Sequence, residues 1–153
     1  MPCNLYGPDD SFDPLHSHVM AALVRRFVDA AERGDGSVTL WGTGGARREF
    51  LHVDDMAEAV MILLDRWPSA EIVNVGSGED LSIAELARLV AEKAGFGGAI
   101  GWDSSRPDGM PRKCLDVSRL ASFGFVPSVS LEAGIEEMIA LYRARKNRQK
   151  ESA

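Results

Sequence analysis

Histidines and cysteines are the residues of this chain that could do acid–base or metal chemistry. His18 lies where a helix is expected to begin, and an imidazole exchanges protons near neutral pH. It could act as a general acid, or it could only hydrogen-bond the backbone at the start of the helix. His16 is a weaker candidate close by, and His52 is expected to be structural. Cys3 and Cys114 have no CxxC spacing, so we predict neither a metal site nor a disulfide framework, and Cys3 is expected to be a small buried residue.

The motifs of a complete nicotinamide enzyme are missing from the sequence. Residues 42–45 are glycine-rich, but their spacing fits neither the dinucleotide fingerprint nor the Walker loop, and we interpret them as a turn after a strand. The single Tyr-x-x-x-Lys sequence, Tyr142 to Lys146, lies on the expected last helix with no site before it. A complete nicotinamide oxidoreductase is therefore not expected within this chain.

Periodic apolar residues and turn signals predict the elements that would position these groups. Four longer helices are predicted: from Ser17 to about residue 31, from Asp54 or Asp55 to about 66, from 82 to 95, and from Ser130 to about 142. The third begins at the Ser82/Glu85 capping box and ends at Gly95, and a short helix is expected to be capped at 116–118. In the second helix we expect Met56, Ala59, Val60, Leu63 and Leu64 to face inward. Residues 38–41, 72–75 and 99–102 are predicted strands, with 72–75 buried, and 104–111 is a predicted loop. This alternation favours an α/β layered domain.

Composition and charge exclude several classes of protein. The 153 residues are 45% hydrophobic and 26% charged, which is ordinary globular usage. The net charge of −6 argues against nucleic acid as a partner, and no apolar run is long enough for a membrane span. Residues 143–153 are basic, and we expect them to form a solvated or frayed tail. Reduced cysteines fit a cytoplasmic location.

A series of motifs then resembles a known family in one consistent order. These motifs are NLYGP at 4–8, SHV at 17–19, RREFLHVDD at 47–55, NVGSG at 74–78 and RPDGMPRK at 106–113. Together they resemble the C-terminal part of the extended short-chain dehydrogenase/reductases, and most specifically the GDP-L-fucose synthase family. The resemblance extends to about Tyr142. It implies a mixed α/β substrate-binding domain over residues 1–142, with a few strands of the cofactor domain but without the main dinucleotide-binding half.

The resemblance also implies an activity and a set of site residues. The family epimerises carbons 3 and 5 of GDP-4-keto-6-deoxy-D-mannose and reduces the 4-keto group with NADPH. His18 matches the catalytic acid, and the pyrophosphate calls for arginine or lysine donors. The matching cofactor positions are Pro2, Asn4, Leu5 and His18, and the matching substrate positions are Arg26, Trp41, Arg48, Asp108 and Lys113. We expect Arg26, Arg48 and Lys113 to face a common hollow.

Each assignment has a simpler alternative when the residues are considered alone. Pro2–Leu5 could be a plain turn, Arg26 a solvated arginine and Trp41 a core residue. Arg48 could pair with Glu49 or Asp54, and the loop bearing Asp108 and Lys113 could be simple surface.

The resemblance also predicts what the chain lacks. The family's Ser, Tyr and Lys, its catalytic Cys and its glycine-rich turn have no counterpart here, and Cys3 does not match the catalytic Cys. We therefore expect a fragment that is inactive alone, binds NADP(H) poorly, and is unstable or prone to self-association; the complete enzyme would be a homodimer. The alternatives are a non-catalytic nucleotide-sugar binding module, which could pair with a separate cofactor-binding chain, and part of another nucleotide-sugar epimerase or reductase.

Overall fold

The computed structural model describes residues 1–151 and has a mixed α/β architecture, which confirms the predicted fold class. The helices are α1 (Val19–Arg33), α2 (Val53–Arg66), α3 (Ile83–Ala94), α4 (Ser118–Ala121) and α5 (Leu131–Glu151). The strands are β1 (Asn4–Tyr6), β2 (Ser37–Trp41), β3 (Arg47–His52), β4 (Asp80–Ser82), β5 (Ala99–Asp103) and β6 (Arg112–Lys113).

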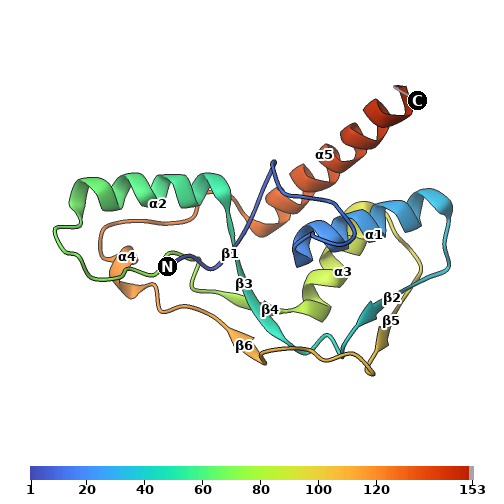
Figure 1. Cartoon of the computed structure of the whole chain (residues 1–153), viewed down its shortest axis with the longest axis horizontal. Helices are drawn as coiled ribbons and strands as arrows, with labels where there is room; N and C mark the ends of the chain where they lie inside the picture. Colours follow the sequence, from blue (N-terminus) through green and yellow to red (C-terminus); the bar gives the residue numbers. More distant parts are fainter. Residues whose placement is uncertain (152–153) are drawn as a thin grey trace.

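Strand β3 is the centre of the larger sheet. β1 and β6 pair with it in parallel, with Asn4 opposite Phe50 and Lys113 opposite Arg48, whereas β4 pairs with it antiparallel. β2 and β5 form a separate parallel pair. Figure 1 shows β3 running from the neighbourhood of β2 and β5 to the start of α2, with α2 on one side of the strand and α1, α3 and α5 on the other.

The main core lies among α1, α3 and α5. Phe27 of α1 is fully buried, and its ring centroid lies 5.5 Å from that of Phe96. A second, smaller core lies under α2 and α4; its buried members are Leu51, Ala59, Val73, Val75, Leu120 and Phe125. Burial of this apolar surface is the dominant stabilising term of the fold.

Local sequence signals fix the ends of two helices as predicted. α1 stops at Gly34, whose φ of 71° lies in the left-handed region that glycine tolerates. α3 begins with the predicted capping box, in which Glu85 N–H donates to Ser82 Oγ at 3.1 Å and Ser82 N–H donates to Glu85 Oε2 at 2.7 Å. The predicted strands at 38–41 and 99–102 are confirmed as parts of β2 and β5.

Helix α2 begins and packs differently from the prediction. Its N-cap is His52, whose Nδ1 accepts the Asp54 N–H, rather than Asp54 or Asp55. Asp55 is instead buried. Ala59 faces inward as expected, but Val60 and Leu64 are 38% and 76% exposed, so their predicted burial is wrong. Helical periodicity identifies an apolar stripe, but it does not show which residues of that stripe pack against another element.

The predicted buried strand over residues 72–75 does not form. Only Val75 makes a single bridge, to Pro2, and Ile72 is 72% exposed. A short β-branched run has strand propensity, but pairing requires a neighbouring strand with free backbone groups. β3, β4 and β6 were not predicted, because β3 begins with three charged residues, and β4 and β6, with three and two residues, are too short to show an apolar alternation.

The basic C-terminal residues are helical rather than frayed, and the first of them are docked. α5 runs through Arg143 to Glu151 without interruption. Arg145 donates to the carbonyls of Pro8 and Asp10, and Lys146 Nζ lies 2.6 Å from Asp29 Oδ1. A frayed tail is therefore wrong for residues 143–151, which are helical, and residues 143–146 are docked; residues 147–151 are exposed, as expected, and residues 152–153 lie outside the described part of the chain. Net charge alone did not reveal these partners.

Candidate functional site

Asn4 and Lys113 border one cavity, of about 360 Å³, together with Pro2. The Asn4 amide donates to the Glu49 carbonyl at 2.8 Å, which holds β1 against β3. Lys113 is exposed on β6, on the other side of the same cavity. The structure thus brings Pro2 and Asn4, which the resemblance assigns to cofactor binding, close to Lys113, which it assigns to substrate binding.

His18 and Leu5 border a different cavity, of about 450 Å³, beside the chain segment Tyr6–Asp10 and the start of α2. His18 is exposed at the N-cap position of α1, and its side chain makes no capping hydrogen bond. The simpler reading of His18 as a residue that caps the helix with its side chain is therefore not supported. An exposed imidazole at the mouth of a cavity can exchange a proton with a bound ligand.

Arg26 lies apart, in a cavity of about 310 Å³ lined also by Arg25 and Arg33. Its guanidinium donates to the Thr39 carbonyl at 2.6 Å. Burial, and next the charge of Arg25, lower the pKa of Arg26. Arg26, Arg48 and Lys113 do not together line any of the four described cavities, so the expectation of a common hollow is not met within residues 1–151.

The loop over residues 104–111 is fastened to the rest of the molecule at two points. Asp108 accepts two hydrogen bonds from Thr43, one from the backbone N–H at 2.7 Å and one from Oγ1 at 2.6 Å. These bonds hold the pKa of the Asp108 carboxyl below its usual range. Arg48 donates to the carbonyls of Met110 at 2.7 Å and Arg47 at 2.8 Å, rather than pairing with Glu49 or Asp54.

Trp41 stands exposed beside this loop. Its side chain is 69% exposed at the end of β2, which excludes the core position considered above. The Arg106 guanidinium carbon lies over the indole at 5.3 Å from its centroid. An accessible indole with a cation above it offers a face on which an aromatic base can stack.

Sequence reasoning missed the residues that hold these parts in place. Thr43 lies in the glycine-rich turn that we treated as a plain connection, and it accounts for the position of Asp108. Asp80 accepts from Arg112 and, at 2.7 Å, from Arg47, and these two arginines, Arg112 first, lower the pKa of Asp80. No local motif marks such long-range partners.

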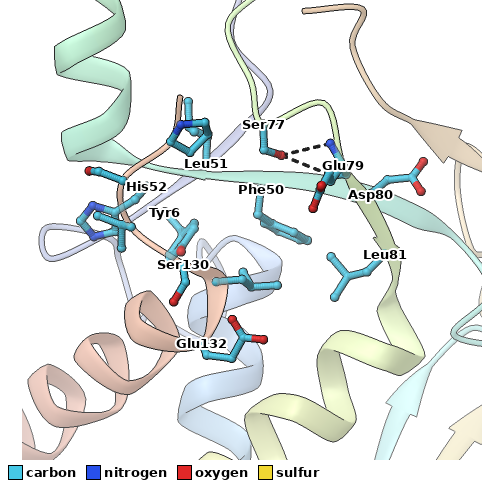
Figure 2. Close-up of a pocket in the computed structure, with 14 residues that line it drawn as sticks. Tyr6, Phe50, Leu51, His52, Ser77, Glu79, Asp80, Leu81, Ser130 and Glu132 are labelled. Carbon is cyan, nitrogen blue, oxygen red and sulfur yellow. Dashed lines mark hydrogen bonds between the residues drawn. The ribbon is translucent and has the colours of Figure 1, made fainter. Parts of the chain in front are cut away.

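Figure 2 shows the largest described cavity, of about 520 Å³, between the sheet and the start of α5. None of the predicted site residues lines it. Tyr6, Phe50 and Leu81 form apolar walls, and the carboxylates of Glu79 and Glu132 add negative charge. Such a lining repels an anionic diphosphate, so this cavity does not compete with the arginine-bearing regions as a nucleotide site.

The cysteine thiols are poor nucleophiles in this setting. Burial, and next the charge of Glu49, raise the pKa of Cys3 to about 12, and burial also raises the pKa of Cys114. Cys3 is half-buried rather than fully buried. At pH 8, below both thiol pKa values, the unreactive protonated forms predominate.

We expect iodoacetamide at pH 8 to label the two cysteines of the folded chain far more slowly than those of the same chain in urea, because the folded chain holds fewer thiolates. Mass spectrometry measures the labelling rates, and equal rates would contradict this prediction.

Comparison with known proteins defines the class of this chain. The model of the NAD dependent epimerase/dehydratase family matches residues 1–76. The chain is 54% identical to GDP-L-fucose synthase 1 of Arabidopsis thaliana and 46% identical to GDP-L-fucose synthase of Escherichia coli K12. These matches cover 93% and 88% of the chain but only 44% and 45% of the two relatives. The chain belongs to the NAD dependent epimerase/dehydratase family.

Within that family, both of these relatives are GDP-L-fucose synthases, as the motifs indicated, and a GDP-L-colitose synthase of Yersinia pseudotuberculosis is 37% identical over 96% of the chain and 48% of its own length. A solved structure, a GDP-L-fucose synthetase from Naegleria fowleri bound to NADP, has the same fold with a TM-score of 0.87 and 24% identity. The match covers 95% of this chain and 46% of that one. Among residues 1–151, no helix has the length and apolar character needed to cross a membrane.

Proposed function

We propose that this chain forms the GDP-sugar-binding part of an enzyme of the GDP-L-fucose synthase type. Such an enzyme epimerises carbons 3 and 5 of GDP-4-keto-6-deoxy-D-mannose and reduces the product with NADPH. The observation that carries the proposal is the surface where exposed Trp41 adjoins the loop anchored by Asp108 and Arg48. An aromatic face next to guanidinium groups suits a purine diphosphate.

In this proposal each residue has a separate task. Arg48 and Lys113 contribute positive charge toward the pyrophosphate, with Arg26 binding a more distant part of the ligand. His18 returns a proton to the epimerising carbon, since epimerisation beside a ketone needs an acid to reprotonate the enolate.

For NADP(H), this chain offers only a partial site. Pro2 and Asn4 line the 360 Å³ cavity, a size that suits one end of a dinucleotide better than the whole. The nicotinamide, when bound, supplies the hydride for the reduction, and Asn4 would help to orient it. The sequence contains no glycine-rich dinucleotide fingerprint that could hold the cofactor pyrophosphate. We therefore propose that the isolated chain binds NADP(H) weakly and does not turn over. Cytoplasmic location, absence of a nucleic-acid partner and homodimerisation of the complete enzyme stay predictions.

Calorimetric titration of the purified chain with GDP tests the proposal directly. We expect micromolar binding of GDP and weaker binding of UDP and dTDP, together with no NADPH oxidation when the keto sugar is added. Preference for UDP or dTDP would indicate a different nucleotide-sugar enzyme. GDP binding by the chain, in a genome that encodes no cofactor-binding partner chain for it, would favour a non-catalytic binding module. No binding of any nucleotide would contradict the proposal.

Tryptophan fluorescence gives a second, residue-specific prediction. Stacking of guanine on Trp41 should quench its emission, and Trp41→Phe should abolish most of the response to GDP. Trp41→Ala should weaken GDP binding by about tenfold, because base–aromatic stacking contributes roughly 1–3 kcal/mol. Trp67 is the matched control, since the Arg119 guanidinium carbon lies over its ring at 5.0 Å near α4. A response that disappears with Trp67→Phe instead would refute this placement of the base.

A further inference from the structure

Glu49 is a buried carboxylate at the junction of three distant segments. It lies on β3 and its side chain is 0% exposed. Its Oε1 accepts the Gly78 N–H at 2.7 Å, and its Oε2 accepts the Leu115 N–H at 2.8 Å. Its main-chain carbonyl accepts the Asn4 side-chain amide at 2.8 Å. One residue thus connects residues 2–4, 76–78 and 112–115.

The turn over residues 76–78 is shaped around this carboxylate. A Cβ atom built on Gly76 would lie 2.1 Å from Glu49 Oε1, so only glycine leaves room for the side chain. Gly78, which donates the hydrogen bond, has a φ of 78°, a conformation that favours glycine. The two glycines of this turn are therefore explained by a single acidic side chain on the neighbouring strand.

Burial of a carboxylate is costly, which argues that its two hydrogen bonds have a purpose beyond stability. A buried charge has a large desolvation penalty, and well-packed apolar residues often give equal or greater stability. Through Leu115 the carboxylate fixes the 112–115 segment beside the 360 Å³ cavity, and both Glu49 and Leu115 line that cavity. The segment that the carboxylate holds carries Lys113, and the main-chain carbonyl of the same residue holds Asn4; these are the residues proposed above for substrate and cofactor.

We propose that Glu49 is a positioning residue that sets the relative placement of Asn4 and Lys113 across this cavity. The proposal rests on the function proposed above. In Glu49→Gln, the amide NH₂ replaces one acceptor oxygen and faces a backbone N–H, so one of the two anchoring bonds is lost. Loss of the Leu115 bond releases the 112–115 segment that carries Lys113, and loss of the Gly78 bond releases the 76–78 turn that packs against the same carboxylate.

Asp55 provides a matched control. It is 1% exposed, and its carboxylate also accepts backbone hydrogen bonds, from Ser128 at 2.8 Å and Val129 at 3.2 Å. It holds the chain before α5, away from the 360 Å³ cavity. Asp55→Asn therefore removes a bond of the same kind without touching Asn4 or Lys113.

The experiment compares both variants by thermal melting, GDP calorimetry and amide hydrogen exchange. Both should melt at a lower temperature than the parent chain. Glu49→Gln should weaken GDP binding about tenfold, the equivalent of one lost charge-assisted hydrogen bond, and Asp55→Asn should leave it within about twofold. Equal GDP affinities in the two variants, at similar stability, would overturn the positioning role.

Hydrogen exchange separates this inference from the proposed function. If the parent chain does not bind GDP, the proposed function fails, but Glu49→Gln must still accelerate exchange at the amide of Gly78 or of Leu115, whichever loses its acceptor, and not at those of Ser128 and Val129. Unchanged exchange at Gly78 and Leu115 would overturn the inference. If Glu49→Gln does not fold, Gly76→Ala serves in its place, because the added methyl group displaces the carboxylate; the same exchange pattern is required of it.

Discussion

Replacing Phe27 with alanine should lower the free energy of unfolding by about 3–5 kcal/mol, a large share of the roughly 5–15 kcal/mol that stabilises a typical domain. Phe27 is fully buried at the contact of α1 with α3 and α5. Truncation removes its apolar contacts and leaves a cavity that the surrounding helices fill only partly. Urea denaturation followed by circular dichroism measures the change.

Val126→Ala is the control for this substitution. Val126 is 74% exposed, so its truncation should change the free energy of unfolding by no more than about 0.5 kcal/mol. A Phe27→Ala variant as stable as Val126→Ala would show that the α1–α3–α5 core does not hold the chain together.

Arg48→Ala should weaken GDP binding by about a hundredfold, or roughly 2.7 kcal/mol, if the proposed site is correct. The variant loses the charge near the diphosphate and also the hydrogen bond to the Met110 carbonyl that anchors the 104–111 loop. The loss therefore combines a direct contact with the ordering of Asp108. Calorimetry with GDP gives the affinity, and circular dichroism verifies that the variant is folded.

Arg66 provides a matched comparison for Arg48. It also donates to a loop carbonyl, that of Phe123 at 2.9 Å, but at the end of α2. Arg66→Ala should therefore leave GDP affinity unchanged. Similar losses of affinity in the two variants would mean that general loosening of loops, and not the position of Arg48, controls binding.

The elements that sequence predicts well are those whose determinants are local. The capping box at Ser82 and Glu85 and the glycine stop at Gly34 each act within one turn of helix, and both form as predicted. The failed predictions depend on distant partners. Residues 72–75 had the composition of a strand but lacked a neighbouring strand beyond the single bridge at Val75, and the exposed face of α2 packs against nothing among residues 1–151.

The residues of the candidate site also differ in whether their determinants are local or distant in the sequence. Motifs are the basis on which Arg48, Asp108 and Trp41 are proposed, because side-chain type and order along the chain are visible in a sequence. They did not identify Thr43 or Glu49, whose partners are backbone groups or side chains far along the chain. A backbone N–H is present at almost every residue, so a sequence does not mark the one that a buried carboxylate selects.

The close approach of Tyr6 to α5 has a consequence for the order in which contacts form. A Cβ atom on Gly134 would lie 2.2 Å from the Tyr6 hydroxyl oxygen, so β1 and α5 fit directly against each other. Because this contact joins residues far apart in the sequence, its loop-closure entropy is large, and it should form later than the turns of the individual helices.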